Sequence, residues 1–190
     1  MLASEQALEL IESRLSRRRY EHSLQVALAA REMARDYGLD AEKAYLTGLL
    51  HDYAKGLSGA ELLRIAEEQR LLQEEIERQV PDLLHATVGA YLLEAEGKVL
   101  DPEILYAIRV HTLGAEQMSD FDKIIFLADM IEPGRDYPGL QRLQCLARKD
   151  LDQAMLFALD STIRYCLEQG RLLHPQTIKV RNNFLQALKE

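Results

Sequence analysis

Six side chains with metal-binding chemistry occupy the apolar stripes of predicted helices, at positions where leucines are expected. They are His22, His51, Asp52, His85, His111 and Asp129. His22, for example, shares a helical stripe with Val26 and Met33. A buried carboxylate without a partner is costly. A metal would neutralise the two aspartates and use the imidazoles as ligands, so one cause would explain every departure from the apolar pattern.

The alternative for each histidine taken singly is a packed or hydrogen-bonded core residue, and that explanation would have to hold for every one of them. We therefore favour a metal site. Imidazole with carboxylate suits a borderline or hard divalent cation, and the adjacent pair His51-Asp52 can hold one ion or bridge two.

Helical periodicity predicts an all-α chain with no alternating strand. Gly38, Gly97, Gly114 and Gly170 stop helices, while Ser58, Asp101 and Ser119 are typical of helix starts. No repeat or long linker divides residues 1–190, which predicts a single domain. The expected helices span residues 5–15, 18–37, 41–52, 59–69, 82–96, 102–113, 120–131, 140–149, 151–169 and 176–188.

Composition and charge argue against a nucleic-acid-binding protein. The chain has 190 residues, is 47% hydrophobic and carries a formal charge of −8, which argues against nucleic acid as a partner. Arg17, Arg18 and Arg19 form the one compact basic run, and a solvated helical turn and a substrate-facing role are both left open for it.

The cysteines and the short apolar runs indicate where the protein is located. Cys145 and Cys166 form no C-x-x-C pair, so we expect reduced, mostly packed thiols. Ser4, Glu5 and Glu9 interrupt any signal-peptide core, and no apolar run reaches the length of a membrane span. These features predict a soluble cytoplasmic protein.

Two cations near the proposed ligands point to phosphate chemistry. Lys55 follows Asp52 by three residues, and Arg135 follows Asp129 by six. Hydrolysis of a phosphate ester or anhydride needs a metal to make hydroxide and cations to neutralise the phosphate. Taken alone, Lys55 could be a surface lysine and the loop 132–139 a mere connection, but their positions beside the ligands favour contact with substrate.

Other hydrolytic schemes fit less well. The chain contains no H-E-x-x-H, no G-x-S-x-G, no G-x-x-x-x-G-K-[ST] and no G-x-G-x-x-G. His174 precedes Pro175 outside the helical stripes and is more typical of a turn than of a ligand.

Taken together, the motifs resemble a known family. The match is carried by RYEHS at 19–23, LLHDYAK at 49–55, HATVGA at 85–90, HTLG at 111–114, KIIFLAD at 123–129, IEPGRD at 131–136 and LHPQT at 173–177. With these residues the chain resembles the HD-domain superfamily of metal-dependent phosphohydrolases. Within it, the chain is similar to the YqeK-type symmetrical hydrolases of diadenosine tetraphosphate.

The resemblance implies an HD-type helical bundle in which His22, His51, Asp52 and Asp129 hold a divalent transition metal. Iron is the expected ion, and manganese is the alternative. His85 and His111 would hold a second ion or meet the phosphates. Further residues would lie along the nucleotide: Arg19, Asp52, Lys55, His85, His111, Thr112, Asp129, Arg135, Gly170, Arg171, Leu172, Leu173, His174 and Pro175.

We therefore expect a metal-held hydroxide to split diadenosine tetraphosphate into two ADP, with Asp52, Lys55 and Arg135 as the catalytic residues. The alternatives are a nucleoside-monophosphate or cyclic-nucleotide phosphohydrolase and a nucleotide-sensing module without turnover. The sequence leaves the native metal, the number of ions and a homodimeric state open.

Overall fold

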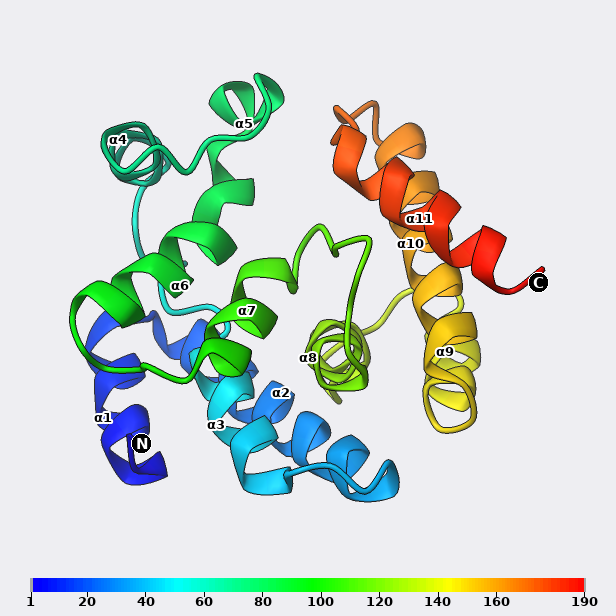
Figure 1. Cartoon of the computed structure of the whole chain (residues 1–190), viewed down its shortest axis with the longest axis horizontal. Helices are drawn as coiled ribbons and strands as arrows, with labels where there is room; N and C mark the ends of the chain where they lie inside the picture. The colour runs from blue at the N-terminus through cyan, green and yellow to red at the C-terminus, as the bar shows by residue number, and fades with distance from the viewer. Residues whose placement is uncertain (1, 190) are drawn as a thin grey trace.

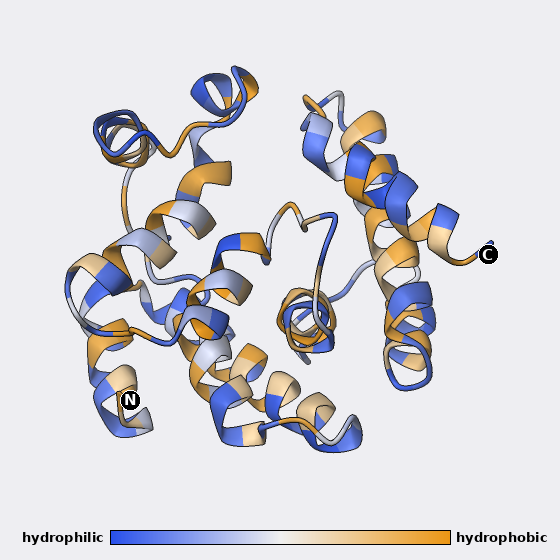
Figure 2. Cartoon of the chain, in the orientation of Figure 1, coloured by the Kyte–Doolittle hydropathy of each residue, from blue (hydrophilic) through white to orange (hydrophobic). Residues whose placement is uncertain are grey.

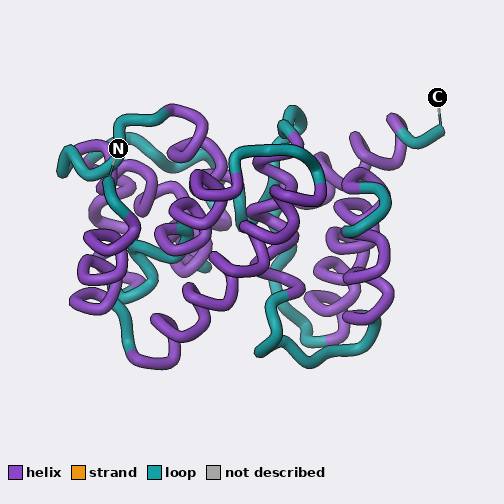
Figure 3. Tube along the Cα trace, turned by 90° about the horizontal axis from the view of Figure 1, so that it is seen from below, coloured by secondary structure: helices purple, strands orange, loops and turns teal. Residues whose placement is uncertain are grey.

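Every regular element within residues 2–189, the part of the chain that this computed structural model describes, is a helix (Figure 3). The first half contains α1 (Ser4–Arg14), α2 (Arg17–Asp36), α3 (Ala41–Leu50), α4 (Gly59–Glu68), the short α5 (Ile76–Gln79) and a 3₁₀ turn, η1 (Pro81–Leu84). The second half contains α6 (His85–Ala95), α7 (Pro102–Val110), α8 (Asp120–Ile131), α9 (Leu140–Ala147), α10 (Leu151–Glu168) and α11 (Pro175–Ala187). The all-α prediction is confirmed.

The helix starts depend on the side-chain caps that the sequence indicates. Ser58 and Ser119 each form a capping box with the acidic residue three positions later, at the starts of α4 and α8. Asp101 accepts hydrogen bonds from the first backbone amides of α7, where Pro102 begins the helix. These caps agree with the expected positions.

The expected boundaries are wrong by two or more residues at four places: α9 ends at Ala147 rather than at residue 149, and the other three errors lie next to a histidine. α3 ends at Leu50 rather than at residue 52, and α7 ends at Val110 rather than at residue 113. α6 begins at His85, because the preceding residues form the 3₁₀ turn. The short helix α5 was not expected at all. As described below, the histidine rings bond to carbonyls that a continuing α-helix would use for its own backbone.

α2 lies against both α3 and α8, and α7 lies beside α3, α6 and α8 (Figure 1). The crossing of α2 and α3 depends on Gly48, since a Cβ added there would come within 2.6 Å of the Ala27 Cα atom. A side chain at this position would push the two helices apart. Glycine therefore brings the end of α3, with its histidine and aspartate, close to α2.

Within residues 2–189, the buried apolar side chains form three clusters. Figure 2 colours the hydrophobic stretches of the helices orange. The larger cluster joins α2 and α8 to α9, α10 and α11. A second cluster joins α1, α3, α6 and α7, and a third lies under α4. The polar site described below lies where the C-terminal ends of α3 and α7 come close to α2 and α8.

Two further expectations concern the thiols and the membrane. Both cysteines are free, but Cys145 is exposed, so the expectation of packed thiols is wrong for that residue. Within residues 2–189, no helix has both the length and the apolar character that a membrane crossing requires. The prediction of one domain over residues 1–190 stays a prediction.

Candidate metal and substrate site

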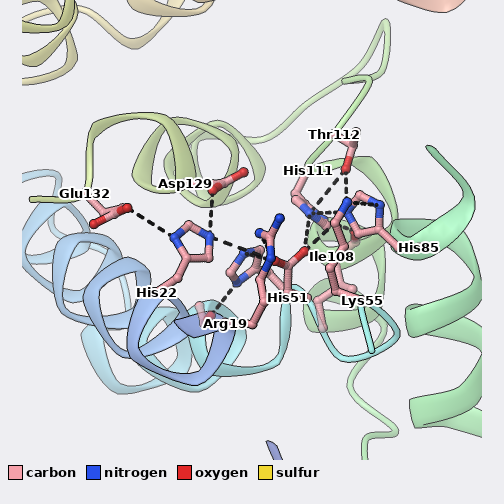
Figure 4. A network of polar contacts seen from close by, with 12 residues as sticks. Arg19, His22, His51, Lys55, His85, Ile108, His111, Thr112, Asp129 and Glu132 are labelled. Atoms are coloured by element: carbon pink, nitrogen blue, oxygen red, sulfur yellow. Dashed lines mark hydrogen bonds and ion pairs between the residues drawn. The ribbon is translucent and has the colours of Figure 1, made fainter. Parts of the chain in front are cut away.

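Four histidines and two aspartates that are far apart in sequence converge in the interior (Figure 4). The four imidazoles form a row in the order His22, His51, His111, His85. Neighbouring ring centroids are 5.3, 5.0 and 5.1 Å apart, and every pair meets edge to face. The structure thus brings together all six ligand-type residues that the sequence singles out.

Three of these rings are oriented by the backbone of their own turn. The Nδ1 atoms of His51, His85 and His111 lie 2.7, 2.5 and 2.6 Å from the carbonyl oxygens of Gly48, Asp82 and Ile108, each three residues earlier. A carbonyl oxygen can only accept, so each Nδ1 carries the proton and donates it. The unprotonated Nε2 atoms therefore face the centre of the site, as in metal-binding histidines.

His22 is oriented by a side chain from a distant part of the sequence. Its Nδ1 donates to Glu132 Oε1 over 3.1 Å, and Glu132 is buried at the end of α8. The backbone amide of Gly134 also donates to the Glu132 carboxylate. Sequence analysis missed this role of Glu132, although the residue lies inside the IEPGRD stretch that carries the family resemblance.

Asp52 lies at the middle of the row and is 2% exposed. Its Oδ1 is 3.3 Å from His85 Nε2, while its Oδ2 accepts a 2.9 Å hydrogen bond from Arg19. The same Oδ2 lies 3.6 Å from His51 Nε2 and 3.9 Å from His22 Nε2. One carboxylate therefore reaches both ends of the row.

Asp129 and Arg135 stand together at the His22 end. Asp129 Oδ1 lies 3.0 Å from His22 Nε2 and accepts a hydrogen bond from the Arg135 guanidinium. The Arg135 Nε also donates to the Asp129 backbone carbonyl over 2.7 Å. The loop after α8 thus places Arg135 against Asp129, the last of the proposed ligands in the sequence.

The two ends of the row differ in electrostatics. Burial lowers the pKa of His22, but the hydrogen bond and the negative charge of Asp129 outweigh it and leave that pKa raised. Burial lowers the pKa of His85, and it lowers the pKa of His111 to about 3. Burial raises the pKa of Asp129, yet the His22 hydrogen bond and nearby positive charges hold it well below its usual value.

The arrangement of acceptor atoms fits a bound cation. With their Nδ1 protons directed outward, His22 Nε2 faces a carboxylate oxygen at 3.0 Å, and the Nε2 atoms of His85 and His111 face each other at 3.2 Å. Two acceptors this close need a cation or a proton between them. The buried Nε2 of His51 has no hydrogen-bond partner within residues 2–189. The site can therefore hold a metal ion.

Two overlapping groups of donor atoms have the spacing of a metal site. One comprises His22, His51 and Asp129, and the other comprises His51, Asp52 and His111. In each group the ligand atoms all lie within 4.8 Å of one another. His51 is common to both groups, and its Nε2 would be a ligand to an ion held by either of them.

Lys55 and Thr112 lie at the His85 end. The Lys55 Nζ is 2.9 Å from Asp82 Oδ2 and 3.1 Å from His85 Nδ1. Thr112 Oγ1 lies 3.1 Å from His85 Nε2 and 3.2 Å from His111 Nε2. A cation and a hydroxyl group thus flank the two neutral imidazoles, as the sequence suggests.

The segment Gly170–Pro175 is not joined to the row by any hydrogen bond or ion pair among the described residues. His174 instead caps α11, accepting from the backbone amide of Gln176, and its Nε2 lies 3.5 Å from Glu77 on α5. Both side chains of this pair are buried. The structure therefore agrees with a turn histidine, and a nucleotide contact of this segment remains a proposal.

Two cavities open beside the row. The larger, of about 700 Å³, lies between the first turns of α2 and the loop after α8, next to His22. A smaller one of about 250 Å³ is lined by His111, Thr112, Tyr137 and neighbouring apolar side chains. Arg135 lines both. The histidine row is thus accessible to a ligand from either side of this arginine.

Comparison with known proteins agrees with the family resemblance seen in the sequence. The chain is 38% identical over 183 residues to the symmetrical bis(5'-nucleosyl)-tetraphosphatase of Halalkalibacterium halodurans, covering 96% of this chain and 97% of the relative. It is 35% identical to the protein of that name from Bacillus subtilis, covering 94% and 95%.

The fold also matches that of a solved structure. A crystal structure from Clostridium acetobutylicum, described as a predicted HD superfamily hydrolase involved in NAD metabolism, superposes with a TM-score of 0.93 at 35% identity and covers 98% of this chain and 99% of that one. The HD domain family model matches residues 19–134, which contain all six convergent ligand-type side chains. The HD-type fold is confirmed, and the chain belongs to the HD domain family.

Proposed function

We propose that this chain is a metal-dependent hydrolase that splits diadenosine tetraphosphate symmetrically and releases two molecules of ADP. The observation that carries the proposal is the row of four imidazoles directed at Asp52, with Lys55 near one end and Arg135 at the other. The relatives named symmetrical bis(5'-nucleosyl)-tetraphosphatase, which match over nearly the full chain, support the choice of substrate.

His22, His51, Asp52 and Asp129 are the ligands that we propose for the first metal ion, with iron preferred and manganese as the alternative. His85 and His111 would hold a second ion or contact the phosphates. A divalent metal bound there would lower the pKa of water and neutralise phosphate charge. The oriented Nε2 atoms of His51 and His111 and the lowered pKa of Asp129 support this ligand set, because they leave these donor atoms free to bind a metal.

The cations around the row have separate tasks in this proposal. Arg135 offers a planar guanidinium that can grip two phosphate oxygens, and Lys55 offers a compact charge. Arg19 neutralises Asp52 from the solvent side at 2.9 Å. Together they would stabilise the negative charge that develops on the transferring phosphoryl group and the departing ADP.

Asp52 is placed to orient the attacking water as well as to bind metal. It is buried and reaches both ends of the row. Burial raises its pKa, but the electrostatic effect of His51, His85 and His111 outweighs burial and leaves that pKa lowered, so the carboxylate is ionised at neutral pH. Thr112 offers a hydroxyl beside the two neutral imidazoles. We propose that Thr112 and the segment Gly170–Pro175 line the path of one ADP unit.

The decisive experiment is chromatography of the products that the purified, metal-loaded protein forms from diadenosine tetraphosphate. ADP alone supports the proposal, whereas ATP plus AMP would mean attack at an outer phosphate. Tight ADP binding with no turnover would favour a sensing module. Faster hydrolysis of a nucleoside monophosphate or a cyclic nucleotide would favour the other phosphohydrolase alternative. Cytoplasmic localisation and a homodimer stay predictions.

A further inference from the structure

The cavity next to His22 has no role in the metal site itself. Its volume of about 700 Å³ lies in the range of small-molecule pockets. Its walls are the first turns of α2, including Arg18 and Gln25, and the loop at Pro133 and Gly134. It lies at the opposite end of the histidine row from Lys55 and His85 (Figure 4).

Most charged groups in this cavity are already paired. Arg19 binds Asp52, Arg135 binds Asp129, and Glu132 binds His22. The remaining carboxylate, Glu21, pairs with Arg17 on the outer face of α2. These four groups therefore leave little charge free for a ligand.

Arg18 and Gln25 are different. Within residues 2–189, neither side chain makes an ion pair or a hydrogen bond, yet both line the cavity. Arg18 thus offers an unpaired guanidinium to an anion. Gln25, about two helical turns further along α2, offers an amide group that can both donate and accept a hydrogen bond. The neighbouring Arg17 lies outside the cavity, with its side chain 91% exposed.

The cavity continues into a more apolar one along the same helix. Gln25 and Pro133 line both cavities, and the second, of about 350 Å³, adds Leu28, Met33 and Ile131. Leu28 is 39% exposed. At a rise of about 1.5 Å per residue, the path from Arg18 to Leu28 is about 15 Å long. A charged end and a polar middle are thus followed along α2 by a wall that contains Leu28, where Glu32, Asp36 and Arg148 also line the cavity.

We infer that this α2 groove, formed by Arg18, Gln25, Leu28 and Pro133, binds a second nucleoside diphosphate unit, the half of the substrate that extends away from Lys55. The inference rests on the proposed function, because a dinucleotide cut in its centre must extend a nucleoside diphosphate to each side of the metal site. Arg18 pairs with the phosphates of this half, Gln25 contacts its sugar or base, and the base packs near Leu28.

Calorimetric titration of the metal-loaded protein with ADP tests the inference without turnover. The wild-type chain should bind two molecules of ADP. Arg18→Gln should weaken one of the two binding events roughly tenfold, as expected for loss of one charged contact. The matched variant Arg164→Gln, at an exposed arginine on α10 away from the groove, should bind as the wild type does.

Kinetics provide the second measurement. Arg18→Gln should raise the KM for diadenosine tetraphosphate roughly tenfold and change kcat little, because the group binds substrate away from the scissile bond. One ADP per chain in the wild type, or equal effects of Arg18→Gln and Arg164→Gln, would overturn the inference. A wild type that binds two ADP but hydrolyses no diadenosine tetraphosphate would overturn the proposed function and still support a nucleotide site in the groove.

Discussion

The two ends of the histidine row are oriented in different ways. His51, His85 and His111 each donate to a backbone carbonyl three residues earlier, whereas His22 donates to the side chain of Glu132, 110 residues away. The first arrangement is local, because each ring bonds to a carbonyl of its own turn, at the ends of α3 and α7 and at the start of α6. The second exists only when α2 packs against α8.

This difference also separates the charges. The carbonyl-oriented His85 and His111 are neutral because burial lowers their pKa values. His22 stands among the carboxylates of Asp129 and Glu132, and its pKa is raised despite burial. One end of the row is thus a neutral pair and the other a charged network, and Asp52 touches both.

The largest effect should come from removing the group that the two ends share. Asp52→Asn should lose metal and reduce turnover at least about 1000-fold, because it removes a ligand-type carboxylate and leaves buried imidazoles without it. Elemental analysis and initial rates are the measurements. Glu12→Gln, at an exposed carboxylate on α1, is the control. Full metal content and activity in Asp52→Asn would remove the basis for treating the row as one site.

Arg135→Ala tests the charged end alone. Turnover should fall by roughly ten- to a thousandfold, the scale for one charge-stabilising group, with metal content intact. Arg109→Ala, at an exposed position on α7, should behave as the wild type does. If Arg135→Ala is fully active, the loop after α8 serves only as a connection.

Glu132→Gln tests how strongly metal affinity depends on the side chain that orients His22. Loss of this carboxylate should weaken metal binding roughly tenfold, the lower end of the range for partners of metal ligands. Competition with a metal-sensitive dye measures the affinity. The three carbonyl-oriented histidines offer no equivalent substitution. Wild-type affinity in Glu132→Gln would mean that His22 needs no carboxylate to hold it.

Chelation tests the link between the site and the fold. Since the proposed ligands lie on separate helices, removing the metal should lower the melting temperature by about 5–15 °C. Calorimetry with and without chelator measures the shift. The Asp52→Asn variant should show no further shift on chelation. Equal melting temperatures of the metal-free and metal-loaded wild type would contradict the metal site.

The smallest expected effect concerns the pKa values of the histidines in the metal-free protein. Nitrogen NMR should find His22 titrating above 6.5 and His111 neutral down to a pH of about 3. His22 then contributes stability that is present below pH 6.5 and lost as pH rises through its folded pKa. His85 and His111 contribute stability that is present above pH 6.5 and lost as pH falls. Identical titrations at both ends would show that the two ends do not differ.

Much of the fold could be predicted because helix signals are local. The start of α4 follows from Ser58 with Glu61, and the start of α7 follows from Asp101-Pro102. The errors occur where local competition decides. α3 and α7 stop early because the rings of His51 and His111 take carbonyls near the helix ends. Helix α5 has only four residues, too few for a periodic pattern.

The sequence by itself determined which residue types the interior receives, because apolar periodicity assigns each position to a face before any helix meets another. His22, His51 and Asp129 could be identified in that way. Only the tertiary structure decided which of these groups touch, since contacts between α2, α3 and α8 depend on packing across the core. The pairing of His22 with Glu132, and the lack of a partner for Arg18 among residues 2–189, are consequences of that packing and leave no periodic signal in the chain.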